Sequence, residues 1–108
     1  MSKYSNRKTE IDGIYFDSAR EARRYCELKL LQMAGEISDL EIQPKFMLLE
    51  GFRHGGLVVK PITYRADFRY AEKGKTVVED VKGCKTEVYN IKKKLLLNRY
   101  PDINFIET

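Results

Sequence analysis

Residues 64–83 read Tyr-Arg-Ala-Asp-Phe-Arg-Tyr-Ala-Glu-Lys-Gly-Lys-Thr-Val-Val-Glu-Asp-Val-Lys-Gly. Both halves of this stretch are rich in β-branched and aromatic residues, and its middle is polar with a glycine, which predicts a β-hairpin. With the turn at residues 73–74, antiparallel pairing places Asp67 directly opposite Asp80. Because side chains alternate between the two faces of a strand, Lys82 lies on the same face as Asp80.

The two facing aspartates predict a metal site. Like charges directly opposite one another destabilise a sheet, so we expect a cation between the carboxylates of Asp67 and Asp80. Two carboxylates with an ammonium group beside them form a hard-metal site that carries its own charge partner. The alternative interpretation is a surface hairpin with scattered charges.

Length and composition indicate a single domain, residues 1–108, of an ordinary soluble protein. We expect residues 1–13 to be flexible, because they are polar. No apolar run approaches the roughly 20 residues that span a bilayer, and the polar, basic N-terminus lacks the apolar segment of a secretory signal. The two cysteines have no metal-binding or redox spacing. These features predict a cytoplasmic protein with no membrane contact.

Positive charge is clustered rather than spread evenly. The net charge is +4, and a basic surface around an acidic site suits a polyanion such as nucleic acid. The alternative is solubilising charge on helix faces. The basic clusters are Lys3, Arg7 and Lys8; Arg20, Arg23 and Arg24; and Lys92, Lys93 and Lys94.

Two helices are predicted. Ser18 followed by Glu21 forms a capping box that opens the first helix, and Gly35 is its natural end. Thr86 opens the second helix, and Pro101 ends it. The apolar stripe of the first helix contains Ala22, Cys26, Leu30 and Met33, and that of the second contains Val88, Ile91, Leu95 and Leu96.

Strands fill the rest of the chain. Leu40–Leu49 is predicted as one strand that lies at an edge or bends at Pro44. Residues 51–56 read as a loop, the hairpin runs from about Pro61 to Val81, and Ile103–Ile106 is a short final strand. The order of elements is therefore helix, three strands, helix, strand.

This order and the spacing Asp67 … Asp80-Val81-Lys82 resemble the PD-(D/E)XK, or restriction-endonuclease-like, nuclease superfamily. The resemblance implies an α/β fold with an αβββαβ core, in which helices flank a mixed sheet. Ala66 stands where the motif usually has proline, a position that varies within the superfamily.

The resemblance is closer to phage junction-resolving and transposon end-cleaving endonucleases. It rests on three segments: Phe16-Asp17-Ser18-Ala19-Arg20-Glu21, Tyr64-Arg65-Ala66-Asp67-Phe68 and Val78-Glu79-Asp80-Val81-Lys82-Gly83. The chain also resembles a family of small phage and prophage proteins of the same superfamily. A phage-encoded protein would work in the cytoplasm of its host.

The resemblance implies a site for phosphodiester cleavage. Asp67 and Asp80, with the carbonyl of Val81, would bind one or two Mg²⁺ ions, with Mn²⁺ as a substitute. Lys82 would hold the attacking water and stabilise negative charge in the transition state. Glu21 would complete the metal site from the first helix, and its alternative role is the helix cap alone.

Several other residues are candidates for supporting roles. Glu79 is the rival of Asp80, although it lies on the face opposite Lys82, and its alternative is a solvated or edge carboxylate. Lys92 is the first choice for a phosphate contact, since cations carry most non-specific DNA affinity. Arg20, Arg24 and Lys93 are further nucleic-acid candidates, and Gln43 on the preceding strand is a weaker site candidate.

The expected function is that of a Mg²⁺-dependent DNA endonuclease in recombination, repair or packaging. A Holliday junction or other branched DNA as substrate follows from the resemblance. Cutting both strands requires two active sites, which predicts a homodimer. The alternatives are a non-catalytic nucleic-acid-binding module on the same fold, and an interaction protein whose motif is accidental.

Overall fold

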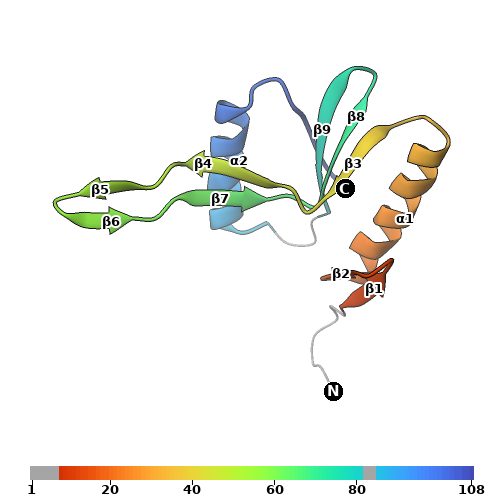
Figure 1. Cartoon of the computed structure of the whole chain (residues 1–108), viewed down its shortest axis with the longest axis horizontal. Helices are drawn as coiled ribbons and strands as arrows, with labels where there is room; N and C mark the ends of the chain where they lie inside the picture. Colours follow the sequence, from red (N-terminus) through yellow and green to blue (C-terminus); the bar gives the residue numbers. More distant parts are fainter. Residues whose placement is uncertain (1–7, 82–84) are drawn as a thin grey trace.

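The computed structural model describes residues 8–81 and 85–108, which contain two helices and ten strands (Figure 1). The helices are α1 (Ala19–Met33) and α2 (Glu87–Arg99). The strands are β1 (Thr9–Ile11), β2 (Ile14–Phe16), β3 (Ser38–Ile42), β4 (Lys45–Leu49), β5 (Phe52–His54), β6 (Leu57–Val59), β7 (Ile62–Arg65), β8 (Phe68–Glu72), β9 (Lys75–Asp80) and β10 (Asn104–Glu107).

The central sheet has four strands in the order β10-β9-β8-β3. It is a mixed sheet, because β10 runs parallel to β9 while the other pairs are antiparallel. The predicted hairpin register is confirmed, since Phe68 pairs with Glu79 and Glu72 with Lys75. Lys73 and Gly74 both have positive φ, 51° and 76°, as a two-residue type I′ turn requires.

The sheet forks beside Asp67. The strand predicted over Leu40–Leu49 is broken at Gln43 and Pro44, so β3 joins the central sheet while β4 pairs with β7. The first half of the predicted hairpin is likewise broken, between β7 and β8. Backbone hydrogen bonds join the residues at these two interruptions. Gln43 N–H donates to the Asp67 carbonyl at 2.9 Å, and Ala66 N–H donates to the Pro44 carbonyl at 3.1 Å.

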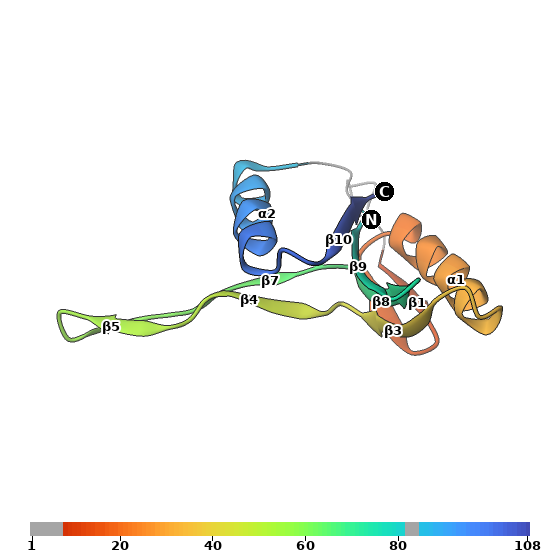
Figure 2. The same cartoon turned by 90° about the horizontal axis from the view of Figure 1, so that it is seen from above.

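A two-stranded ribbon extends from the fork away from the rest of the molecule (Figures 1 and 2). Its inner part is β4–β7, and its outer part is β5–β6, which forms where the sequence predicted a loop over residues 51–56. The extended ribbon helps explain why the radius of gyration is 16.0 Å, against about 13 Å for a compact chain of this length.

Each helix covers a separate core. Helix α1 packs on one face of the central sheet, where Leu28 and Tyr25 contact a cluster that includes Phe68 and Val77. Helix α2 lies over the ribbon's inner part (Figure 2), where Leu96 joins a cluster that includes Phe46. The sheet therefore carries one helix on each side, which makes the protein a mixed α/β fold. Neither helix in the described ranges is long and apolar enough to cross a membrane.

The predicted helix ends are confirmed, but the predicted apolar stripes are largely wrong. Ser18 and Thr86 accept hydrogen bonds from backbone N–H groups of the first turns of α1 and α2, and Gly35 follows α1 with φ 81°. The buried residues are Ala22, Tyr25 and Leu28 in α1, and Tyr89 and Leu96 in α2. The predicted stripe residues Cys26, Leu30, Met33, Val88, Ile91 and Leu95 are exposed.

The segment expected to be flexible, residues 1–13, includes a strand in its last part. Strands β1 and β2 form a hairpin, with its turn at Asp12-Gly13. The hairpin is held to the core because Phe16 is buried and the Tyr25 hydroxyl donates to Asp12 Oδ2 at 2.8 Å. Residues 1–7, which include Lys3 and Arg7, lie outside the described residues.

Candidate functional site

Asp67 lies at the fork, between the end of β7 and the start of β8. Its backbone N–H donates to the Glu79 carbonyl at 3.2 Å. Its carboxylate atom Oδ2 accepts a hydrogen bond of 2.6 Å from the Val81 N–H, the first residue after β9. Asp67 therefore fastens the ends of β8 and β9 together, and its half-buried side chain stays accessible to solvent.

Asp80 is the last residue of β9, and it is fully buried. Its carbonyl accepts a 2.9 Å hydrogen bond from the Thr108 N–H, which ties it to the end of β10. The pKa of the Tyr89 hydroxyl on α2 is raised by burial, by its bond to Glu107 and by the negative charges of Asp80 and Asp67. The charges of both aspartates therefore affect the Tyr89 hydroxyl, as expected if the two carboxylates lie near each other.

Glu21 in the first turn of α1 approaches the site from the other side. Burial, followed by the negative charges of Asp67 and Asp17, raises the pKa of Glu21 to about 7. Its N–H also donates to Ser18 Oγ at 3.1 Å. The two interpretations of Glu21 are thus compatible, because the residue caps the helix and its carboxylate is close enough to Asp67 to interact with it.

The donors at the fork suit a hard cation. They are the carboxylates of Asp67 and Asp80 with the Val81 carbonyl, all oxygen ligands. Within residues 8–81 and 85–108, no group of three or more histidine, cysteine, aspartate or glutamate side chains is arranged to hold a metal ion. Mg²⁺ is usually held by one or two carboxylates with water and substrate phosphates, so the pair of aspartates still fits this ion. Lys82 lies outside the described residues.

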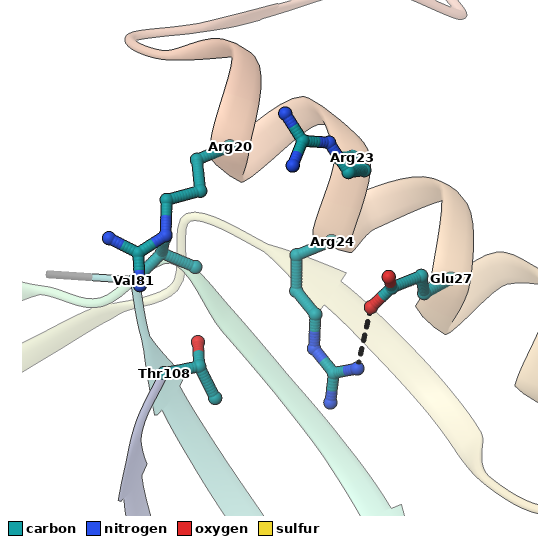
Figure 3. Close-up of a pocket in the computed structure, with 6 residues that line it drawn as sticks. All are labelled: Arg20, Arg23, Arg24, Glu27, Val81 and Thr108. Carbon is teal, nitrogen blue, oxygen red and sulfur yellow. Dashed lines mark hydrogen bonds and ion pairs between the residues drawn. The ribbon is translucent and has the colours of Figure 1, made fainter.

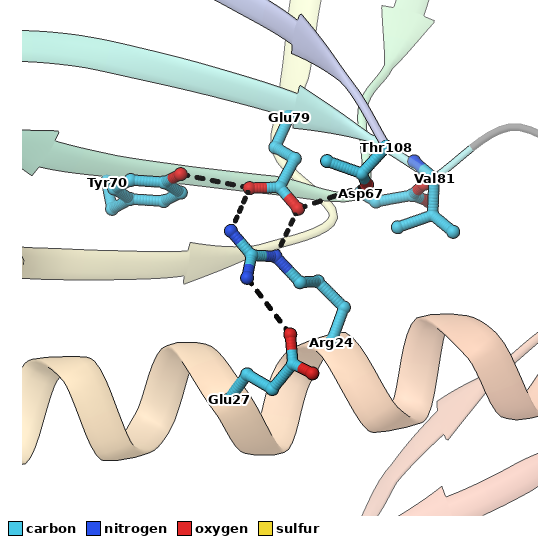
Figure 4. Close-up of polar contacts among 7 residues, drawn as sticks. All are labelled: Arg24, Glu27, Asp67, Tyr70, Glu79, Val81 and Thr108. Atoms are coloured by element: carbon cyan, nitrogen blue, oxygen red, sulfur yellow. Dashed lines mark hydrogen bonds and ion pairs between the residues drawn. The ribbon is translucent and has the colours of Figure 1, made fainter.

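Glu79 has a role that the sequence analysis missed. It points to the opposite face from Asp80, as predicted, but it is fully buried rather than solvated. Arg24 of α1 binds it through two bonds, Nε to Oε2 at 2.5 Å and Nη2 to Oε1 at 3.0 Å. The hydroxyls of Tyr70 and Thr108 also donate to it, at 2.9 and 3.3 Å (Figure 4). Glu79 therefore ties α1 to β8, β9 and the end of β10.

The predicted nucleic-acid contacts fall into two groups. Arg24 is bound to Glu79 and, at 3.0 Å, to Glu27. Lys93 lies 3.2 Å from Glu107 Oε1. Both cations therefore already have carboxylate partners.

The other two candidates, Arg20 and Lys92, form no hydrogen bond or ion pair with any residue that the structure describes. Arg20 is exposed and Lys92 is half-buried. Gln43 does not face the aspartates through its amide, which donates to the Tyr15 carbonyl at 3.3 Å.

Glu107 on β10 is a second residue that the sequence analysis did not single out. It pairs with Asp80 in the parallel ladder. It accepts a short hydrogen bond from the Tyr89 hydroxyl and contacts Lys85 and Lys93, and these three bonds lower the pKa of Glu107 to about 2. Glu107 thereby anchors the start of α2 beside Asp80.

The fold and the site together define a mixed α/β protein with an acidic group at a fork of its sheet, between two helices that carry basic residues. Residues 1–107 match the family described as "Protein of unknown function (DUF1064)", and the chain belongs to this family. Neither the curated proteins nor the solved structures contain a match to the chain.

Proposed function

We propose that this protein is a Mg²⁺-dependent endonuclease that hydrolyses phosphodiester bonds in DNA, built on a restriction-endonuclease-like core. The observation that carries the proposal is that Asp67 and Asp80 lie at the same end of the β8–β9 hairpin, where the Val81 N–H binds Asp67 Oδ2, with Glu21 close enough to Asp67 for its charge to act on Glu21. Asp67 comes from the break between β7 and β8, Asp80 from the end of β9 and Glu21 from the first turn of α1.

The burial of each carboxylate supports a distinct role. Asp67 is half-buried and reaches solvent, so it is the carboxylate that meets the substrate side. Asp80 is fully buried, and it pairs in the parallel ladder with Glu107, which accepts a hydrogen bond from the Tyr89 hydroxyl. Burial limits the movement of the Asp80 side chain, as a metal ligand requires. Burial and the charge of Asp67 raise the pKa of Glu21 to about 7, in the range where a carboxyl group can take up and release a proton near neutral pH.

Asp67, Asp80 and the Val81 carbonyl would hold the Mg²⁺ ion. When bound, the ion polarises the scissile phosphate and lowers the pKa of a bound water. Lys82 follows Val81 directly and, as the sequence motif implies, its ammonium group would stabilise negative charge on the phosphate. The bond between Val81 N–H and Asp67 keeps the backbone before Lys82 close to the aspartates.

The resemblance to junction-resolving enzymes favours branched DNA as the substrate. We further propose that two copies act together, because each copy offers one such site and a junction must be cut on two strands. The setting would be the cytoplasm, for a phage protein that of the host.

A non-catalytic nucleic-acid-binding module is the second candidate. One observation favours it: the described side chains include no group of three potential metal ligands. In this case DNA binding would depend on salt as it would for a nuclease, but the protein would leave the DNA strands intact whichever divalent metal ion is added.

The decisive experiment is a cleavage assay on four-way junctions, flaps, nicked duplexes and linear duplexes, each with Mg²⁺, Mn²⁺ or Ca²⁺. We expect cleavage of branched DNA with Mg²⁺ or Mn²⁺ and none with Ca²⁺. Asp67→Asn should lower the rate by at least about 100-fold, since it removes one metal ligand. Arg53→Gln, at the outer end of the ribbon, is the matched control and should cut like the wild type.

Three results would count against the proposal. Cleavage that Asp67→Asn leaves unchanged would remove the site from the mechanism. Binding of DNA without cleavage in every metal would establish the second candidate. A protein that neither binds nor cuts any of these DNAs would exclude both.

A further inference from the structure

A stripe of charged residues runs along α1 on the side of the strand ends. Arg23 and Arg24 are neighbours, and each lies three or four residues from both Arg20 and Glu27, so the four side chains lie on one side of the helix. They line a pocket of about 190 Å³ together with Val81 and Thr108 (Figure 3). At the roughly 30 Å³ that each water molecule takes in the liquid, this pocket has room for an oxyanion and several waters.

The positive charge of the pocket is only partly neutralised. Arg24 is engaged by Glu79 and Glu27. Arg20 and Arg23 are exposed, and neither forms a hydrogen bond or ion pair with any residue in the described parts of the chain. A guanidinium group stays charged at all relevant pH values and offers five donors that match the oxygens of a phosphate.

The pocket adjoins the candidate site. Val81 forms part of its lining, and the Val81 N–H donates to Asp67 Oδ2 at 2.6 Å. Thr108, on the other side, is bonded through its N–H to the carbonyl of Asp80. Figure 3 shows Arg20 extending from α1 toward these two strand ends. An anion in the pocket would therefore lie next to the carboxylates and on the side of α1.

We propose that Arg20 and Arg23 bind a backbone phosphate of the DNA strand, next to the phosphate taken by the Asp67 site. This assignment rests on the proposed function and deepens it, because it names the side on which the substrate strand leaves the site. Arg24 has a different role: it lines the pocket, but its guanidinium is bound to Glu79 and Glu27.

The test is the salt dependence of DNA binding, measured by fluorescence anisotropy in EDTA so that no strand is cut. Each phosphate contact contributes about 0.9 to the slope of log K against log salt for duplex DNA. We expect Arg20→Gln and Arg23→Gln each to make the slope shallower, by about 0.9 in the double variant because the two side chains share one phosphate, and to weaken binding uniformly across sequences. The matched control, Arg53→Gln on the ribbon, should keep the wild-type slope.

The outcomes separate this inference from the proposed function. Wild-type slopes in both pocket variants, with normal DNA binding, would overturn the pocket assignment and leave the nuclease proposal standing. A wild-type protein that binds no DNA would overturn both. Inorganic phosphate provides a further arm: if it raises the melting temperature of the wild type but not of Arg23→Gln, while DNA affinity is equal in the two proteins, the pocket takes free phosphate and the DNA assignment is wrong.

Discussion

At the level of single residues, Glu79 and Asp80 are neighbours on β9 with different roles. Strand alternation predicts correctly that they point to opposite faces. The sequence also contains a signal for the burial of Glu79, because Val77 and Phe68 on the same face are core residues. It does not reveal the partner, since Arg24 is 55 positions away and two adjacent arginines look equivalent. Only packing distinguishes Arg24, which faces the sheet, from Arg23, which faces solvent.

Replacement of Arg24 tests the assignment of the ion pair. Arg24→Ala leaves the carboxylate of Glu79 buried without its cation, which typically costs about 3–5 kcal/mol of the free energy of unfolding. Arg23→Ala, the same change one residue earlier, should stay within about 0.5 kcal/mol of the wild type. Urea denaturation followed by circular dichroism measures both. Equal losses in the two variants would contradict the described contacts.

A second change excludes a trivial loss of helix stability. The double variant Arg24→Met with Glu79→Met removes both charges together and should recover most of the stability lost in Arg24→Ala, because apolar replacements of a buried pair are often neutral. If the double variant is as unstable as Arg24→Ala, the ion pair is not the cause.

At the level of elements, features set by neighbouring residues were predicted correctly, whereas features set by packing between elements were not. The caps at Ser18 and Thr86 and the turn at residues 73–74 are fixed by neighbouring residues, and they were predicted. The apolar stripe of α2 was predicted from periodicity alone; Leu96 of that stripe is buried, but the helix turns Tyr89 inward while Val88, Ile91 and Leu95 are exposed. The breaks beside Asp67 were missed because each half of a broken strand keeps the same alternation of apolar and polar residues as a continuous strand.

The orientation of α2 gives a direct test. Leu96 is fully buried, so Leu96→Ala should lower the free energy of unfolding by about 2–5 kcal/mol. Ile91 is 57% exposed, and Ile91→Gln should change it by less than about 0.5 kcal/mol. Both values come from urea unfolding at low protein concentration. A larger loss for Ile91→Gln would mean that the helix presents the face expected from periodicity.

At the level of the whole molecule, the ribbon is the feature without a counterpart in the sequence analysis. An isolated two-stranded ribbon is only marginally stable in water, and exposed apolar side chains that gather in one region often mark an interaction surface. On the ribbon, the large exposed apolar side chains are Leu49, Phe52, Leu57, Val58 and Ile62. The proposed homodimer would give such surface a partner.

The molar mass in solution tests the proposed dimer. Light scattering coupled to gel filtration should give twice the 12.6 kDa of the chain at micromolar concentration. The control is a dilution series, in which the dimer must dissociate at a concentration set by its affinity. A mass of 12.6 kDa at every concentration would mean that one copy acts alone, and that two-strand cutting needs sequential binding.

The account depends most on Asp67 and Asp80 holding one divalent cation. Anomalous diffraction at the manganese edge, from crystals soaked in Mn²⁺, locates such an ion without reference to activity. We expect one strong peak within bonding distance of both carboxylates, and its loss in crystals of Asp67→Asn. A soaked crystal with no peak there, or with the two carboxylates turned to different sides of the sheet, would contradict the account.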